Sequence, residues 1–456
     1  MWHRKLRTER YLAGLWLVLL AACPVGAKEL KGEQVWHGQI ELNEAHMVQE
    51  KSVLTVAAGT RVTVTSPAAK LNVRGRLLIQ GTQTEPVVFV TPGDWEGIEF
   101  MEAEPGSEIH WARFAGAKMA LSSFGTDFTV RNSRFAGCEI AIKLFRESDP
   151  LIVDSEFVDN QIAIDNEMKS VPTIRNNRFS GHSKTAILAA HGSRGEISGN
   201  RFENNKQALG LLQKYQDVVV NNQFIGNEVG IYCNQTQNTP LIEGNLFDKN
   251  NQALVNFSFA YPAVRNNRFT GNETAMRNDQ YGSAQIENNL FQSNVTALYN
   301  NRKSNPRVIA NQFTDNELVM FCDYSSYPQV ERNNFIGSKM AVKLGIYQSA
   351  DWEKRSGSKT IMQREASERR SQNPLLAKVP TQFNDVVDVS GNYWGRQTQL
   401  LNAAGSDGNV EIFHDRRDQP EVTYEGYGPE SYKLDRIRFA PWLETEVAEA
   451  GPQSQP

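Results

Sequence analysis

The sequence has no excess of positive charge. Among its 456 residues, 48 Lys and Arg stand against 52 Asp and Glu, which gives a formal net charge of −4. Proteins that bind nucleic acid usually carry a strong basic excess or a basic stripe, so we expect no nucleic-acid partner. Hydrophobic residues make up 40% of the chain, which is too few for a protein with several membrane spans.

Potential metal ligands are scarce and scattered. The seven His are spread along the chain, and the nine Met form no cluster. Because a metal site needs several ligands of suitable chemistry close together, the sequence predicts no metal site and no cofactor.

The one long apolar run lies at the N-terminus. Basic residues precede the run from Tyr11 to Ala22, and a segment of small residues follows it up to Ala27. This is the plan of a secretory signal, which we assign to residues 1–27. The residues before Cys23 also resemble a bacterial lipobox, in which case the signal is 1–22 and Cys23 carries lipid. Both alternatives predict an exported protein, located in the periplasm, at the outer membrane surface or outside the cell. Contact with a membrane is expected only through a lipid anchor on Cys23.

The rest of the chain is dominated by a repeat of 22 or 23 residues. Phenylalanine recurs at this interval ten times, from Phe135 to Phe335. Five residues before each Phe stands Val or Ile, and an aliphatic residue or Met usually follows seven residues after it. Two residues before the Phe, eight successive units carry asparagine: Asn177, Asn200, Asn222, Asn245, Asn267, Asn289, Asn311 and Asn333.

This repeat predicts an all-β solenoid, namely a right-handed parallel β-helix of about 13–14 coils. A leucine-rich solenoid has a similar repeat length, but it needs several Leu per unit and usually a helical return segment. Here no unit shows the apolar spacing of a helix, and short β-type runs alternate with Asn and Gly corners. Coils stacked at the strand spacing of roughly 4.8 Å place each Phe and Asn against its copy in the next coil. We therefore expect the asparagines to form a structural ladder.

The repeat also divides the chain into segments. It weakens toward the N-terminus, breaks in a charged stretch after Tyr347, and returns around Asn392 and Trp394. The expected organisation is the signal, an N-terminal cap (28–50), the parallel β-helix (51–348), a charged insertion loop (349–384), the last coil with the C-terminal cap (385–443) and a polar tail (444–456).

Three cysteines remain after the signal. Cys233 and Cys322 both follow their Phe by nine residues, so they occupy the same position in coils about 19 Å apart along the stack. That separation is too large for a disulfide, and Cys138 takes an asparagine position of its own coil. We expect small buried thiols that fill interior positions.

Together these features resemble a known family. The Asn-x-Phe coils, the early Trp95-Glu96-Gly97-Ile98 segment and the late Asn392-Tyr393-Trp394-Gly395 are similar to exported bacterial right-handed β-helix repeat proteins. Pectin-degrading enzymes, alginate epimerases and the periplasmic β-helix factor of nitrous-oxide-reductase maturation share that fold. The resemblance implies the fold and leaves the activity open, because one architecture hosts many functions.

Strand alternation identifies one face as a candidate binding surface. If the residue seven after each Phe points inward, the residues eight and ten after it point outward. In the coils from Phe224 to Phe313, these positions carry aromatic residues together with Arg, Asn and Asp. Aromatic rings can stack on sugar rings, and the polar side chains can form hydrogen bonds with them. An ordinary solvated sheet face is the alternative interpretation. The ligand-binding candidates are Tyr232, Asn234, Phe257, Arg277, Tyr299, Asn301 and Phe321.

The same columns contain two weak catalytic candidates, Asp279 and Asp323. They stand two coils apart, about 10 Å along the stack, which is near the separation used by inverting glycosidases. The chain lacks the Asp-rich and Gly-His-Gly signatures of polygalacturonases, and it also lacks the His-containing run of alginate epimerases and an obvious calcium site.

We therefore expect a non-catalytic envelope protein that binds polysaccharide or another surface ligand, such as an envelope protein, along one sheet face. A polysaccharide lyase, hydrolase or epimerase, and a periplasmic maturation or metal-handling factor, remain as alternatives.

Overall fold

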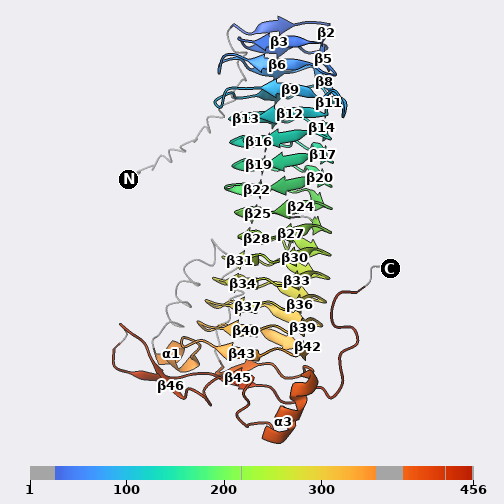
Figure 1. The fold of residues 1–456 in the computed structure, drawn as a ribbon. Coiled ribbons are helices and arrows are strands. Elements are labelled where there is room, and N and C mark those ends of the chain that lie inside the picture. Colours follow the sequence, from blue (N-terminus) through green and yellow to red (C-terminus); the bar gives the residue numbers. More distant parts are fainter. Residues whose placement is uncertain (1–25, 217, 356–383, 427, 454–456) are drawn as a thin grey trace, which may run out of the picture.

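The computed structural model describes residues 26–216, 218–355, 384–426 and 428–453, which form one long solenoid (Figure 1). The expected signal, Cys23 and most of the charged insertion lie outside the described residues. Within the described ranges, no helix is long and apolar enough to span a membrane.

Three parallel sheets run along the solenoid, and each coil contributes one strand to each sheet. Sheet A contains β1 (Lys28–Leu30), β4 (His46–Val48), β7 (Leu71–Val73), β10 (Ile98–Met101), β13 (Met119–Phe124), β16 (Ile140–Phe145), β19 (Ile162–Asn166), β22 (Thr185–Ala189), β25 (Gln207–Leu212), β28 (Val229–Asn234), β31 (Gln252–Phe257), β34 (Thr274–Asp279), β37 (Thr296–Asn300), β40 (Leu318–Cys322), β43 (Met340–Leu344) and β45 (Phe413–His414).

Sheet B and sheet C each have 14 strands, which gives about fourteen turns and confirms the predicted parallel β-helix. Sheet B contains β2 (Glu33–Trp36), β5 (Val53–Ala57), β8 (Arg76–Gln80), β11 (Ser107–His110), β14 (Phe128–Arg131), β17 (Leu151–Val153), β20 (Thr173–Arg175), β23 (Glu196–Ser198), β26 (Val218–Val220), β29 (Leu241–Glu243), β32 (Ala263–Arg265), β35 (Gln285–Glu287), β38 (Arg307–Ile309) and β41 (Gln329–Glu331). Sheet C contains β3 (Gln39–Leu42), β6 (Arg61–Val64), β9 (Val87–Val90), β12 (Ala112–Ala115), β15 (Arg134–Ala136), β18 (Glu156–Val158), β21 (Arg178–Ser180), β24 (Arg201–Glu203), β27 (Gln223–Ile225), β30 (Leu246–Asp248), β33 (Arg268–Thr270), β36 (Leu290–Gln292), β39 (Gln312–Thr314) and β42 (Asn334–Ile336).

The Phe positions of sheet C form one continuous stack in the core. From Phe89 to Phe335, neighbouring ring centroids lie 4.6 to 5.1 Å apart with nearly parallel planes. Trp394 continues the stack after the insertion, with its ring 4.4 Å from that of Phe335. The regular register pairs Phe with Phe in successive strands, so every coil buries its ring against the next one.

The asparagines two residues before each Phe form a hydrogen-bonded ladder at the corner between sheets B and C. The side-chain amide nitrogen Nδ2 of Asn245 donates to the carbonyl oxygen of Val219 at 2.9 Å and to Oδ1 of Asn267 at 3.0 Å. The backbone nitrogen of Asn222 in turn donates to Oδ1 of Asn245 at 2.9 Å. The same pattern runs from Asn177 to Asn333 and ends on Asn392. The ladder thus satisfies the buried backbone groups that the corner would otherwise leave unpaired.

A polar column also lies inside the solenoid, behind sheet A. The side chains of Asn256, Asn278 and Asn300 are fully buried; Nδ2 of Asn256 donates to Oδ1 of Asn278, and Nδ2 of Asn278 donates to Oδ1 of Asn300, each at 2.9 Å. Cys233 and Cys322 occupy the corresponding positions above and below these asparagines. The three cysteines of the described chain are buried free thiols, as expected, and burial raises the pKa of Cys233 and of Cys322 to about 12.

The first described coil lies within the expected N-terminal cap (28–50) and has the same three-strand plan as later coils. Residues 28–48 form the regular strands β1 to β4, and these strands pair with the next turn in the same parallel manner as later coils. The physical reason is that alternating apolar side chains such as Leu42 and Val48 are buried in the common core.

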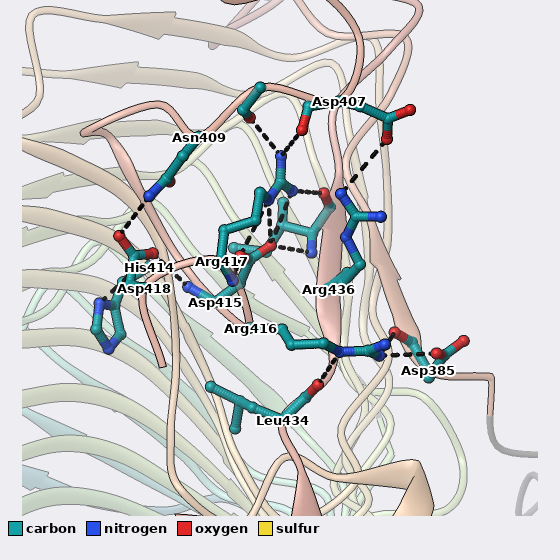
Figure 2. A network of polar contacts seen from close by, with 12 residues as sticks. Asp385, Asp407, Asn409, His414, Asp415, Arg416, Arg417, Asp418, Leu434 and Arg436 are labelled. Atoms are coloured by element: carbon teal, nitrogen blue, oxygen red, sulfur yellow. Dashed lines mark hydrogen bonds and ion pairs between the residues drawn. The ribbon is translucent and has the colours of Figure 1, made fainter. Parts of the chain in front are cut away.

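The C-terminal region closes the other end of the solenoid. It contains α1 (Ala350–Arg355), the parallel pair β44 (Val386–Asp388) and β48 (Arg436–Arg438), the antiparallel pair β46 (Glu421–Thr423) and β47 (Ser431–Lys433), a 3-10 helix η2 (Gly395–Gln397) and α3 (Thr398–Ala404). Figure 2 shows a polar network in this region, which connects the segment 407–418 with Asp385 beside β44, with Leu434 and with Arg436 at the start of β48. At its centre the buried Asp415 accepts hydrogen bonds from Arg417 Nη2 at 2.8 Å and from the backbone nitrogen of Ile437 at 2.6 Å. Burial would raise the pKa of Asp415, but these hydrogen bonds outweigh burial and lower it.

The chain end folds back along the solenoid. The backbone nitrogen of Val447 donates to Oδ1 of Asn334 at 2.9 Å, and that of Gly451 donates to the carbonyl oxygen of Ala310 at 2.9 Å. The described part of the predicted polar tail therefore lies against several coils.

We predict that Asn245→Ala destabilises the solenoid strongly. The change leaves buried backbone groups of Asn222 and Val219 without partners, so the free energy of unfolding should fall by about 3 kcal/mol. Urea unfolding followed by circular dichroism measures this effect. Asn251→Ala is the matched control, because Asn251 is an exposed residue of the same coil. Equal losses in the two variants would contradict a stabilising role for the ladder.

Candidate ligand-binding face

The seven ligand-binding candidates lie on or beside five successive strands of sheet A, from β28 to β40. Tyr232, Arg277, Tyr299 and Phe321 are partly exposed on this face, whereas Cys233, Asn278, Asn300 and Cys322 alternate with them and point into the core. This alternation follows from the strand geometry, in which successive side chains point to opposite sides of the sheet. We call the outer surface of β28, β31, β34, β37 and β40 the sheet A face.

Aromatic rings form two pairs on the sheet A face. The ring centroids of Tyr232 and Phe257 are 6.2 Å apart, and those of Tyr299 and Phe321 are 4.9 Å apart. Arg277 lies between the two pairs, with its guanidinium 5.1 Å from the centroid of the Tyr299 ring. The rings and the guanidinium together cover a length of about 19 Å along the stack, because they belong to five consecutive coils.

Two amide oxygens at the edge of this face are buried without a hydrogen-bond partner among the described residues. They are Oδ1 of Asn234 and Oδ1 of Asn301. Nδ2 of Asn234 lies 3.4 Å from the hydroxyl oxygen of Tyr232. Both oxygens are covered by neighbouring protein atoms, so leaving them without a partner costs stability.

Asp279 is buried instead of facing the solvent, contrary to the expected outward column. Its Oδ1 accepts a hydrogen bond from Arg302 Nε at 2.5 Å, and its Oδ2 accepts from Arg302 Nη2 at 2.6 Å and from Arg277 Nη2 at 2.7 Å. Burial would raise the pKa of Asp279, but the hydrogen bonds from Arg302 and Arg277 outweigh it and hold the pKa below its usual range. The residue is displaced from the surface because Arg302, at the corner of the following coil, covers it.

Asp323 is also buried, with 8% of its surface exposed, in a quite different environment. Its Oδ1 accepts hydrogen bonds from the backbone nitrogens of Tyr324 at 2.9 Å and Tyr347 at 2.8 Å. Burial raises the pKa of Asp323 to about 6, although these two hydrogen bonds act in the opposite direction. Gly345 makes room for the carboxyl group, since a Cβ atom at that position would lie 2.3 Å from Asp323 Cγ.

A further aromatic series, which the sequence interpretation missed, continues beside the face into the C-terminal region. The ring of Tyr347 stacks on that of Tyr324 at 4.4 Å and on that of Tyr424 at 4.7 Å. Tyr432 stacks on Tyr424 at 5.2 Å. The spacing of 23 residues between Tyr324 and Tyr347 is a repeat interval and could have indicated the first pair. Tyr424 follows the insertion, so the periodicity does not predict its position.

We predict that Asp323→Asn stabilises the protein at neutral pH. The folded state raises the pKa of Asp323 from 3.8 to about 6, so it favours the protonated carboxyl group and loses stability as the pH rises through this interval. The free energy of unfolding of the variant should exceed that of the wild type by about 3 kcal/mol well above pH 6, and the difference should vanish below about pH 4.

Asp279→Asn is the contrasting control. Because the folded state lowers the pKa of Asp279, this carboxylate contributes stability that is present above the ordinary pKa and is lost as the pH falls. The variant should therefore be less stable than the wild type at neutral pH. Chemical unfolding between pH 4 and 8 measures both variants, and differences that do not change with pH would refute the assignment of these two environments.

Two family models match the chain. The model described as a right-handed beta helix region matches residues 115–269, and the model described as periplasmic copper-binding protein (NosD) matches residues 241–398. No curated protein sequence matches the chain.

Two solved structures of mutants of the periplasmic alginate epimerase AlgG are similar to the solenoid. They have TM-scores of 0.41 and sequence identities of 14% and 15%, and the similarity covers 66% of this chain and 75% or 76% of the epimerase chain. The strand topology, the repeat and the match to the right-handed beta helix model agree with one another. The chain is a right-handed parallel β-helix repeat protein.

Proposed function

We propose that this protein is a non-catalytic protein of the cell envelope that binds a polysaccharide along the sheet A face. The observation that carries the proposal is the arrangement of the aromatic pairs Tyr232–Phe257 and Tyr299–Phe321 on either side of Arg277. An extended partner suits this face, because its side chains project from five successive coils.

The chemistry of these side chains favours sugar rings. A sugar ring has an apolar face of C–H groups that packs on an aromatic ring, and hydroxyl groups at its edge that need hydrogen-bond partners. The guanidinium of Arg277 and the hydroxyl of Tyr299 belong to partly exposed side chains and can form hydrogen bonds with such hydroxyl groups. An envelope protein is the other partner that we considered, but a protein surface offers fewer hydroxyl groups at regular intervals.

The carboxylates of the face are poorly suited to acid–base catalysis. A general acid or base must reach the proton that it transfers. Both oxygens of Asp279 are held by arginines, and Oδ1 of Asp323 is held by two backbone nitrogens. Because both oxygens of Asp279 are already held, a lyase, hydrolase or epimerase that needs both carboxylates of this pair is disfavoured.

A metal-handling role is the remaining alternative, and the match to a family described as copper-binding raises it. The donor atoms do not fit a copper ion. Residues 241–398 contain no histidine, and Met276, Met320 and Cys322 are fully buried in the core. Among the residues that the structure describes, no three His, Cys, Asp or Glu side chains gather in one place as a metal-binding group would. The proposed function therefore uses no metal.

We further propose that the protein acts in the periplasm. The N-terminal segment predicts export, either with a signal of residues 1–27 or with a lipid anchor on Cys23. The description of the matching copper-binding family as periplasmic supports this compartment. Both forms expose the sheet A face to the polymers of the envelope.

We predict that Tyr299→Ala weakens the binding of polysaccharide to the purified protein by about tenfold, because the ring provides stacking surface at the centre of the face. A glycan array first identifies the ligand, and isothermal titration calorimetry then gives the dissociation constants. Phe145→Ala is the matched control, since Phe145 is a half-buried aromatic residue of sheet A outside the face. The proposal fails if no glycan binds or if both variants bind as tightly as the wild type.

We also predict that the protein releases no product from its ligand. Incubation with a panel of polysaccharides should yield neither new reducing ends nor unsaturated sugars. Product that forms with the wild type and disappears in Asp279→Asn or Asp323→Asn would overturn the non-catalytic assignment, whatever the outcome of the binding experiment.

A further inference from the structure

A separate cleft lies at the corner where the strands of sheet A turn into sheet B. Its volume is about 930 Å³, and the loops that follow β16, β19, β22, β25 and β28 line it. Only its last loop, which contains Gln235, adjoins the sheet A face. The cleft therefore lies mostly over earlier coils than the aromatic pairs.

The backbone repeats the same corner on four successive coils of this cleft. The residue pairs Arg146–Glu147, Met168–Lys169, His191–Gly192 and Gln213–Lys214 all have positive φ angles, between 44° and 74°. Equivalent backbone conformations place Glu147, Lys169, Gly192 and Lys214 in one row along the axis, with the carboxylate at its first end. The two lysines are thus about 10 Å apart, at twice the coil spacing. Gly192 leaves an open notch between them, because a Cβ atom at this position would meet nothing within 4 Å.

Three of the residues that line the cleft are cations without an ion-pair partner. Lys169, Arg194 and Lys214 come from three successive coils, and none of them forms an ion pair with any residue in the described part of the chain. Elsewhere on the solenoid, exposed cations commonly pair with a carboxylate of a neighbouring coil, as Arg131 does with Asp154 and Lys339 with Glu317. The three cations of the cleft are therefore available for an external anion.

The rest of the lining is suited to a polar polymer. The carboxylates of the cleft, Glu147 and Asp149, belong to its first loop, and Oδ1 of Asp149 accepts a hydrogen bond from the backbone nitrogen of Val171 at 2.6 Å. Five amide side chains lie toward the other end, namely Gln213, Gln216, Gln235, Gln237 and Asn238. Amides both donate and accept hydrogen bonds, so they match the hydroxyl groups of a sugar.

We propose that this cleft is a second binding site and that it takes a strand of acidic polysaccharide running along the solenoid axis. Lys169, Arg194 and Lys214 bind carboxylate groups of successive sugars, and the notch at Gly192 admits the polymer between the two lysines. Charge-assisted hydrogen bonds to carboxylates are stronger than neutral ones, and a polymer that repeats its charges can engage several coils at once. The proposal does not depend on the sheet A face, whose aromatic rings suit uncharged ring surfaces.

The experiment compares two double variants of the full-length protein. Lys169→Gln with Lys214→Gln removes two cations of the cleft. Lys184→Gln with Lys206→Gln removes two exposed lysines on neighbouring coils outside it. Binding of hexagalacturonate is measured by calorimetry at low and high salt, with cellohexaose as the neutral oligomer and inorganic phosphate as the small anion.

The wild type should bind hexagalacturonate more tightly than cellohexaose and inorganic phosphate, and this preference should weaken at high salt. The cleft variant should bind the acidic hexamer about tenfold more weakly, and the control variant should change by less than twofold. Equal losses in both double variants, equal affinity for phosphate and the hexamer, or no binding of the hexamer would each overturn the proposal. Tyr299→Ala should leave this binding unchanged, so a failure of the cleft is distinguishable from a failure of the sheet A face.

Discussion

The structure depends on the stacking of like side chains at the spacing of β-strands. From the coil of Asn177 to that of Asn333, each coil supplies one Phe to a ring stack and one Asn to a hydrogen-bonded ladder, and both find their partners in the next coil. A single coil has neither partner, so the ring remains exposed and the corner amides remain unsatisfied until a second coil is present. Stability therefore accumulates along the axis, and the inward positions of every coil are restricted to the same few residue types.

The outward positions are not restricted in this way, which is why the binding surfaces lie there. Parallel pairing uses the backbone and places no demand on the outward side chains of sheet A. Within the same regular register, β28 carries Tyr232 and β34 carries Arg277. The corner loops after sheet A have similar freedom, because their repeated positive φ angles set the path of the backbone while the side chains vary from Lys to Gly. The solenoid thus holds the outward side chains of successive coils at a fixed spacing, and the residue types at these positions determine the chemistry of the surface.

The periodicity of the sequence predicted the architecture, because residues that are one repeat apart in the sequence lie next to each other in successive coils. The Phe stack, the continuation at Trp394 and the buried thiols all follow from counting 22 or 23 residues per coil. Simple alternation did not predict the environment of Asp279, because its burial depends on Arg302 of the following coil reaching back over it. The stacking of Tyr424 on Tyr347 could not be predicted from the repeat, because the insertion separates the two residues. The cleft at Lys169 and Lys214 could not be predicted either, because it depends on corner conformations that no particular residue type indicates.

The internal column of Asn256, Asn278 and Asn300 has a consequence for the alignment of the coils. The outer Asn ladder and the Phe stack are nearly the same in every coil, so a pairing shifted by one whole coil would preserve almost all of their contacts. The internal column disfavours that shift, because the shift would separate an amide from its amide neighbour and remove a buried hydrogen bond. The column thus breaks the translational symmetry of the rod behind the strands that carry the sheet A face. The column therefore favours the correct pairing of the strands whose outward side chains form the sheet A face.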